Sequence, residues 1–352
     1  MKGSSRIPDR MCSWLIQPGN SDIVISSRIR LARNLSEFPF PGQSSQDEMQ
    51  KIRREIASCA GDLKEDLTGY NMENLSSLER QAYMERHLIS KNQSQNPRGS
   101  ATFINEDQTI SIMVNEEDHL RMQFLASGEQ LSSIWKRADN FDDRMEEDLN
   151  FAFSGSCGYL TACPTNLGTG LRASLMLHLP GLSMTDNIEK LLGGVGKFGL
   201  AVRGIFGEGS EVEGSIFQLS NQVTLGVSEQ DIIENLYSIS RQVIEKEKEA
   251  RENLLKSGEY EIKDRIMRAF GILKYAYKIN KLETVHFVSL LLMGDYYGMF
   301  SDFSRDKLLE LLVLTRPAHL QLYFDEKMNP ERRKIFRAKL IKDKLSGFKF
   351  KN

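Results

Sequence analysis

The chain has 352 residues, with 40% hydrophobic and 27% charged side chains, which is ordinary for a globular protein of one large domain or two smaller ones. Its formal net charge of −2 argues against non-specific binding to nucleic acid, which requires an excess of basic residues. No apolar run reaches the roughly 20 residues of a membrane-spanning helix, so no membrane partner is predicted.

The N-terminus and the cysteines indicate a cytoplasmic protein. Residues 1–10 are polar and lack the apolar segment of a secretory signal. The cysteines are widely separated, and none has the Cys-x-x-Cys spacing of a zinc or redox site: Cys12, Cys59, Cys157 and Cys163. We therefore expect reduced thiols and no metal bound by protein side chains.

Residues 1–20 are expected to be a loose lead-in to a first strand that begins at Asp22. In an extended segment, Arg28 and Arg30 project from one face and Ile29 from the other. Two guanidinium groups on one face suit a polyphosphate, because each can bind phosphate oxygens through two parallel hydrogen bonds. The alternative is a solvated basic strand with an apolar back.

Amphipathic helices are predicted over 46–61 and 75–89. His87 lies near the end of the second helix, where a lone histidine is more often structural than functional. Strands over 101–104 and 109–114, separated by four polar residues, then predict a β-hairpin.

Three acids follow this hairpin: Glu116, Glu117 and Asp118. His119 and Arg121 come directly after them. Carboxylates at the end of a core strand are well placed to serve a catalytic cleft. The alternative is an acidic helix N-terminus, in which the carboxylates are stabilised by the helix dipole.

The segment 159–180 combines several features of an anion site. A short apolar run leads to Cys163, a turn with Gly168 and Gly170 follows, and side chains from Arg172 onward alternate with the period of a strand. The pattern predicts strand, tight turn and strand. The thiol, the backbone N–H groups and the arginine could bind an anion; a polar loop above a core cysteine is the alternative.

A glycine-rich loop over 204–214 carries Glu208 and Glu211. The elements expected around this loop and the segment 159–180 are a charged helix over 130–150, a helix over 184–197, strands over 199–203 and 215–220, and a long helix from an N-cap at Ser228 to residue 255.

The pattern changes after Ser257 and Gly258, where strand signals stop. Only helical periodicity remains, over 260–278, 282–293, 304–314 and 330–345. We predict an α+β protein with three parts: a lead-in over 1–20, a domain over 21–255 with an antiparallel sheet flanked by helices, and an all-helical C-terminal domain over 259–352.

Five arginines lie at strand ends or beside glycine-rich turns: Arg28, Arg30, Arg121, Arg172 and Arg203. This set suggests an electrostatic clamp for a triphosphate and its transferred group. The sequence contains neither a P-loop nor the His-Arg-Asp and Asp-Phe-Gly motifs of protein kinases. Glu117, Glu208 and Glu211 suit a cationic acceptor such as a guanidinium, which must lose a proton to a carboxylate before its nitrogen can attack.

Four ordered motifs resemble the phosphagen kinase family: Ser26–Arg30, Asn115–Arg121, Cys163–Ser174 and Arg203–Glu208. They span roughly residues 21–250. The resemblance implies the catalytic fold of creatine and arginine kinases, which is similar to that of glutamine synthetase. It also implies transfer of the γ-phosphoryl group of ATP to a guanidinium nitrogen, with Mg²⁺.

The resemblance also implies roles for single residues. Glu117 would orient and deprotonate the acceptor, Glu208 and Glu211 would serve the same site, and Cys163 would lie beside the acceptor or pack inertly. The implied ATP-binding residues are Ser26, Ser27, Arg28, Ile29, Arg30, His87, Arg121, Arg172, Ala173, Ser174, Leu175, Met176, Arg203, Gly204, Ile205, Phe206, Gly207 and Glu208. Phe206 departs from the arginine kinases, which have an arginine at this position.

The order of the domains is similar to that of the bacterial protein-arginine kinases. In kinases for free guanidino compounds a helical domain precedes the Ser26–Arg30 motif, whereas here only 25 residues precede it and the helical domain follows. This layout implies phosphorylation of exposed arginines in proteins, as a mark for stress response and proteolysis. It also implies a homodimer, a McsA-like zinc-binding activator and a link to the ClpC protease machinery.

The last helix departs from a motif of that family that binds phosphoarginine. Arg333 and Arg337 match two of its arginines, but Lys334 replaces the acid that would recognise the guanidinium group. The two arginines could still bind phosphate, although we expect no activation specific to phosphoarginine. A solvated basic helix is the alternative.

Two other functions fit parts of the pattern. The first is a kinase for free arginine or another small guanidino compound. The second is a non-catalytic regulator that keeps the fold for binding, against which the intact Glu117, Cys163 and arginine set argues.

Overall fold

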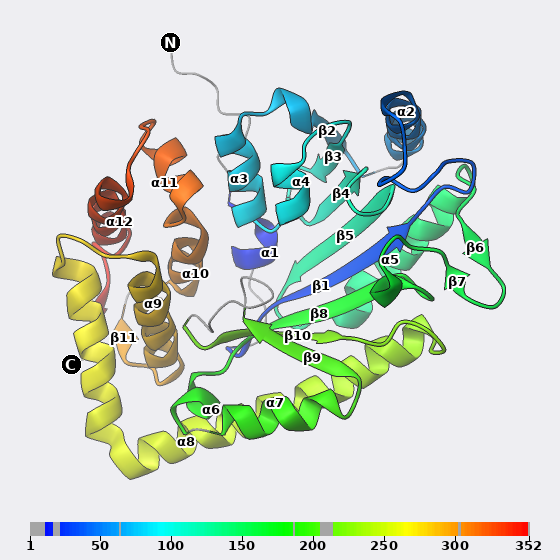
Figure 1. Cartoon of the computed structure of the whole chain (residues 1–352). Coiled ribbons are helices and arrows are strands. Elements are labelled where there is room, and N and C mark those ends of the chain that lie inside the picture. The colour runs from blue at the N-terminus through cyan, green and yellow to red at the C-terminus, as the bar shows by residue number, and fades with distance from the viewer. Residues whose placement is uncertain are drawn as a thin grey trace.

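The computed structural model describes residues 11–16, 22–62, 65–185, 187–204, 214–301 and 304–350. Eight strands form one sheet in which every neighbouring pair is antiparallel, as predicted (Figure 1). Across the sheet the order is β2 (Leu67–Asn71), β3 (Ala101–Asn105), β4 (Ile110–Val114), β5 (Leu120–Ser127), β1 (Val24–Arg33), β8 (Leu171–His178), β10 (Ile216–Asn221) and β9 (Leu200–Gly204). Two short ribbons pair β6 (Phe153–Ser154) with β7 (Gly158–Tyr159) and β11 (Phe300–Ser301) with β12 (Lys349–Phe350).

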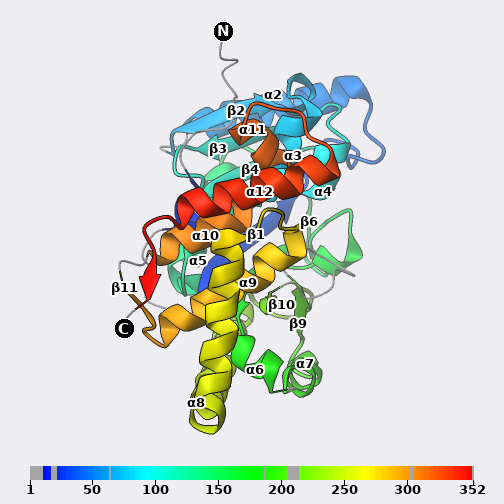
Figure 2. The same ribbon diagram turned by 90° about the vertical axis from the view of Figure 1, so that its left-hand side faces the viewer.

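Helices cover both faces of this sheet. The described helices are α1 (Ser13–Ile16), α2 (Gln46–Asp62), α3 (Ser77–Glu85), α4 (Lys91–Gln95), α5 (Leu131–Glu146), α6 (Pro180–Met184), α7 (Ile188–Gly196), α8 (Glu229–Tyr275), α9 (Lys281–Tyr296), α10 (Arg305–Leu314), α11 (Pro317–Tyr323) and α12 (Pro330–Lys344), with 3₁₀ turns at Met72–Asn74 and Pro164–Asn166. Figure 2 shows α9, α10, α12 and the second half of α8 side by side in the C-terminal region, which confirms that this region is helical. None of these helices is long and apolar enough to cross a membrane.

Strand alternation divides the hydrophobic core into two clusters. Ile29 and Leu31 of β1 join the cluster that α2, α5 and the first half of α8 cover. Ile25 of β1 and Leu125 of β5 join the other cluster, which contains α1, α3 and the C-terminal helices. The helical C-terminal region therefore packs against the sheet itself, because both contribute to one continuous core.

Several local expectations were wrong. Residues 159–163 do not form a hairpin with β8, because β8 pairs with β1 and β10. Gly168 of the turn pairs with this segment through an isolated bridge to Tyr159. Other residues of the turn bond elsewhere: Thr169 N–H donates to Thr224 O, and Ala32 N–H donates to Gly170 O. The helical C-terminal region also contains one short ribbon, in which β11 pairs with β12.

Several further elements escaped the sequence reasoning, among them β2, α4 and α6. Strand β5 begins at Leu120, directly after the acidic turn, and it fills a central place in the sheet. Residues 11–16, assigned to a loose lead-in, are largely buried, and Trp14 is almost wholly enclosed. The short helix α11 begins at Pro317 in the C-terminal region.

The long helix α8 joins the two parts of the chain. Ser228 caps its first turn through a reciprocal bond with Asp231, as the predicted N-cap requires. The helix does not stop at residue 255. It bends at Gly258, whose backbone is non-helical (φ −159°, ψ 53°), and continues to Tyr275.

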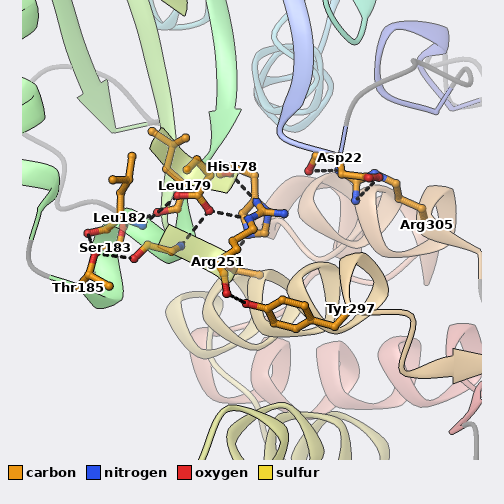
Figure 3. Close-up of polar contacts among 12 residues, drawn as sticks. Asp22, His178, Leu179, Leu182, Ser183, Thr185, Arg251, Tyr297 and Arg305 are labelled. Carbon is orange, nitrogen blue, oxygen red and sulfur yellow. Dashed lines mark hydrogen bonds and ion pairs between the residues drawn. The ribbon is translucent and has the colours of Figure 1, made fainter. Parts of the chain in front are cut away.

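A buried polar cluster connects the sheet, α8 and α9 (Figure 3). The carboxylate of Glu247 accepts the backbone N–H groups of Gly181 and Leu182, both at 2.9 Å, and the Nε of Arg251 at 2.6 Å. Arg251 also donates to the carbonyl of His178 at 2.9 Å, and the hydroxyl of Tyr297 donates to the carbonyl of Arg251 at 2.8 Å. The ion pair is fully buried, so each charge depends on the other.

Glu247→Ala should destabilise the protein strongly, because Arg251 would keep its buried charge without a partner and α6 would lose its cap. We expect a loss of about 3–5 kcal/mol in the free energy of unfolding, measured by denaturant titration. The control is Glu245→Ala on the same helix, since Glu245 is exposed and forms a surface ion pair with Lys248. Equal unfolding midpoints for the two variants would contradict this interpretation.

Candidate functional site

The register of the central strands places the predicted arginines on one face. Arg30 of β1 lies opposite Arg172 of β8, and Arg28 lies opposite Ser174. On the outer pair, Arg203 of β9 lies opposite Gln218 of β10. Arg121 of β5 lies opposite Ala32, two residues from Arg30. Side chains two residues apart share a face, so β1, β5, β8 and β9 direct their guanidinium groups to the same side of the sheet.

These arginines line one cavity of about 570 Å³. Among the described residues, eight basic side chains and one acid, Glu85, line it. The basic residues are Arg28, Arg30, Lys91, Arg121, Arg172, Arg203, Lys281 and Arg316. The excess of positive charge in a chain of net charge −2 indicates an anionic ligand.

Burial in this cavity disfavours the charged forms of Arg28 and Arg30. Burial, together with the charges of Arg121 and Arg172, lowers the pKa of Arg28 to about 9. Burial and the same neighbours, with Arg28, lower the pKa of Arg30 well below its ordinary value. Arg28 donates to Gln218 at 2.6 Å, whereas the buried Nε of Arg30 has no hydrogen-bond partner among the described residues. An anion would stabilise both charged groups.

His87 lines the same cavity in an unusual backbone conformation. It follows α3 with φ +58°, and its carbonyl accepts a hydrogen bond from Gln123 at 2.7 Å. Its ring makes an edge contact with Trp14, with 5.7 Å between centroids. Burial, then Arg28 and Arg316, lowers the pKa of His87 to about 3, so the ring is neutral at pH 7.

The three acids after β4 occupy different environments in the turn that leads into β5. Glu116 pairs with Arg121 at 2.9 Å and accepts the hydroxyl of Ser90 at 2.6 Å. Burial opposes its ionisation, but Arg121 and these hydrogen bonds outweigh burial and lower the pKa of Glu116. Glu117 is more exposed, and partial burial followed by repulsion from Glu116 raises its pKa.

A hydrogen bond to Asp118 connects the segment around Cys163 to this turn. The carboxylate of Asp118 accepts the side-chain amide of Asn34 at 2.6 Å and the backbone N–H of Ala162 at 2.7 Å. The neighbouring Cys163 is half-buried, and its side chain lowers the pKa of Glu117 against the larger effect of burial. The Sγ of Cys163 also lies 3.0 Å from the hydroxyl of Thr165. Glu117 and Cys163 are thus adjacent although 46 positions separate them in the sequence.

Other candidate residues lie elsewhere. The side chains of Ile29, Ala173 and Leu175 are in the core on the opposite face of the sheet. Ser27 is fully buried and donates to the carbonyl of Gly128 at 2.7 Å. Ser26, Ser174 and Met176 line a small hollow of about 10 Å³ beside the cavity, together with Arg28 and His87.

The glycines of the turn before β8 pack against protein atoms. A Cβ on Gly170 would lie 2.5 Å from the guanidinium of Arg33 and 2.6 Å from the carbonyl of Ala32, and its φ is +63°. Neither Gly168 nor Gly170 lines the cavity. Of the segment predicted to bind an anion, Arg172 lines the cavity, whereas these two glycines pack against protein atoms.

The structure gives no support for a site role to two groups of predicted residues. Ile205, Phe206, Gly207, Glu208 and Glu211 lie outside the described residues. Arg337 is buried and donates to the carbonyls of Thr315 at 2.8 Å and Ile279 at 3.1 Å. Arg333 donates to the carbonyl of Met328, and Lys334 pairs with Glu331. These contacts give Arg337 a structural role that its motif does not suggest.

Sequence reasoning missed the other cavity residues. Gln123 and Gln218 are polar residues on core strands, and alternation along 120–127 and 216–221 could have placed them beside the arginines. No local pattern marks Lys281 or Arg316, because only the tertiary fold brings the C-terminal region to the cavity.

Two family descriptions match consecutive parts of the chain. Residues 48–250 match the C-terminal catalytic domain of the ATP:guanido phosphotransferases. Residues 259–352 match the C-terminal domain of the protein-arginine kinase McsB.

Relatives and solved structures agree with these matches. The chain is 47% identical over 344 residues to a protein-arginine kinase of Halothermothrix orenii, covering 97% of this chain and 98% of the relative. It is 43% identical over 338 residues to a protein-arginine kinase of Brevibacillus brevis, covering 95% of each. The duplicated taurocyamine kinase of Schistosoma mansoni superposes with a TM-score of 0.60 and 27% identity, over 67% of this chain and 34% of that one. Lombricine kinase shares the fold with a TM-score of 0.59 and 24% identity, over 71% and 72% of the two chains.

Arg30→Met should raise the melting temperature of the ligand-free protein, because it removes a buried charge that its neighbours repel. A gain of 1 kcal/mol corresponds to roughly 2–4 °C in a domain of this size. The variant should gain less than the wild type from added tripolyphosphate, in thermal melts with and without this anion. Arg54→Met, at an exposed position of α2, should behave like the wild type. An equal response of all three proteins to tripolyphosphate would argue against an anion site at Arg30.

Proposed function

The chain belongs to the ATP:guanido phosphotransferase family, and we propose that it is a protein-arginine kinase that transfers the γ-phosphoryl group of ATP to arginine side chains of proteins. The observation that supports this most directly is the convergence of five arginines from four strands on one cavity. The arginine-lined cavity suits the phosphates of ATP, and the carboxylate of Glu117, next to the Glu116–Arg121 ion pair, suits a guanidinium acceptor.

Each group has a role in this proposal. Arg28, Arg30, Arg121, Arg172 and Arg203 bind the phosphates, and His87 lies against the nucleotide as a neutral ring. Glu117 takes a proton from the acceptor guanidinium, and Cys163 helps to hold the acceptor beside it. A new bond then forms between the guanidinium nitrogen and the γ-phosphorus while the bond from that phosphorus to the bridging oxygen breaks. The products are phosphoarginine and ADP.

Mg²⁺ belongs to the same proposal. The described residues contain no cluster of three metal-ligating side chains, and the cavity walls are cationic. These residues therefore fit an ion that arrives on the phosphates and keeps its water ligands, as Mg²⁺ commonly does. Such an ion would neutralise part of the phosphate charge. Glu208 and Glu211 remain candidates for the catalytic site.

The remaining proposals concern the whole molecule. We place the domain boundary near Gly258, with a catalytic part over 21–255 and a helical part over 259–352. A cytoplasmic homodimer, a McsA-like zinc-binding activator and the ClpC protease machinery would fit a kinase that marks proteins for stress response and proteolysis. Relatives that carry the name protein-arginine kinase along nearly the whole chain support protein acceptors over free arginine.

Glu117→Gln should lower phosphoryl transfer to an unfolded protein by roughly 10²–10⁴-fold and spare ADP binding, because the carboxylate acts on the acceptor and not on the nucleotide. The measurement is mass spectrometry under conditions that preserve P–N bonds, with free arginine in a parallel reaction. Glu106→Gln, in the exposed turn between β3 and β4, is the control. Phosphate found only on free arginine would overturn the choice of acceptor, and an active Glu117→Gln enzyme would overturn the base.

Glu116→Gln should move the acidic limb of the kcat/KM profile to lower pH. The pKa of Glu117 is raised in part by Glu116, and Arg121 would act on Glu117 more strongly without its partner. A base with a raised pKa loses activity as the pH falls through that pKa, so a lower pKa preserves activity in more acidic solution. An unchanged acidic limb would mean that another group is the base.

A further inference from the structure

The cavity has a second wall that the catalytic part does not supply. Lys281 is the first residue of α9, and Arg316 and Pro317 stand at the start of α11. All three belong to the helical C-terminal region, yet they line the same cavity as the sheet arginines. Figure 1 shows α9 and α11 on the side of the sheet where α3 lies.

This second wall is fixed firmly to the catalytic part. The carboxylate of Glu85, at the end of α3, accepts the backbone N–H groups of Ala318 and His319 at 3.0 and 3.1 Å. It also lies 2.8 Å from the Nδ1 of His319, whose Nε2 accepts a hydrogen bond from Arg86 at 2.9 Å. Glu85 and His319 are almost fully buried. Both carboxylate oxygens of Glu85, the single acid among the described residues of the lining, are thus bonded to α11.

The basic residues of this wall add positive charge to a cavity that already contains the sheet arginines. Lys281 stands at the positive N-terminal end of a 16-residue helix, where acids are preferred over bases. Arg316 is 6% exposed, and its Nε donates to the carbonyl of Leu312 at 3.1 Å. Its charge helps to lower the pKa of His87, which lines the same cavity. Two cationic walls facing one space repel each other unless an anion lies between them.

On the basis of the proposed function, we propose that the helical C-terminal region forms part of the nucleotide site, with Lys281 and Arg316 contacting the bound nucleotide from the wall opposite the sheet arginines. The nucleotide then bridges the two parts of the chain. Its binding free energy depends on their relative position, and by linkage its binding favours the docked arrangement. The lining also contains Met84, Ile89 and Pro317, which suit the apolar faces of a base near Arg316.

The test is calorimetric titration of the full-length protein with ADP in the presence of Mg²⁺. Lys281→Gln and Arg316→Gln should each weaken binding by about tenfold, the effect of losing 1.4 kcal/mol. Lys278→Gln is the matched control, because Lys278 is an exposed neighbour that pairs with Glu331 and does not line the cavity. Its dissociation constant should stay within about twofold of the wild type. Equal weakening by Lys278→Gln would point to net charge alone and would overturn the inference.

Hydrogen exchange on the wild-type protein gives a second readout that needs no substitution at the buried Arg316. ADP should slow amide exchange in peptides covering the first turn of α9 and residues 315–320, as well as in β1 and β8. Protection confined to the sheet, with unchanged binding by Lys281→Gln, would refute the second wall and leave the proposed function standing. If the wild type binds no ADP at all, the proposed function itself fails.

Discussion

Repulsion among buried guanidinium groups is the constraint on which the site depends. Arg28, Arg30 and Arg172 project from paired positions of β1 and β8, and burial and mutual repulsion disfavour the charged forms of Arg28 and Arg30. The fold tolerates this arrangement because the strands are anchored by two hydrophobic cores and a ladder of antiparallel hydrogen bonds. The buried charges thus lower local stability, but they are already in place before a ligand binds. Phosphoryl transfer exploits this form of preorganisation.

The three neighbouring acids of the turn before β5 make different contacts. Glu116 neutralises Arg121, Asp118 holds the backbone near Cys163, and only Glu117 remains exposed. Three carboxylates with the same chemistry therefore have three environments, because each meets different partners. His119 completes the turn by accepting the backbone N–H of Leu35 at 3.0 Å. The geometry around Glu117 is thus supported by its neighbours in the turn.

Strand alternation predicted much of the site. Arg28 and Arg30 could be assigned to one face of β1 because Ile29 and Leu31 between and after them are apolar, and the antiparallel class followed from short strands with tight connections. The sequence reasoning failed where partners are distant. The pairing of β8 with β1, the space occupied by Arg33 beside Gly170 and the burial of Arg337 all depend on contacts across many residues. The same limit hid Lys281 and Arg316, which no strand or motif connects to the arginines.

The continuity of α8 has a consequence for how the chain can vary in length. Loops between domains tolerate insertions, because a flexible segment absorbs an added residue. An added residue within α8 would instead turn everything that follows it by about 100° and shift it by about 1.5 Å along the helix axis. The helix contacts the sheet before its bend at Gly258 and α9 after it, so such a rotation would misalign both interfaces together. The number of residues in α8 therefore fixes the orientation of the C-terminal helices relative to the sheet.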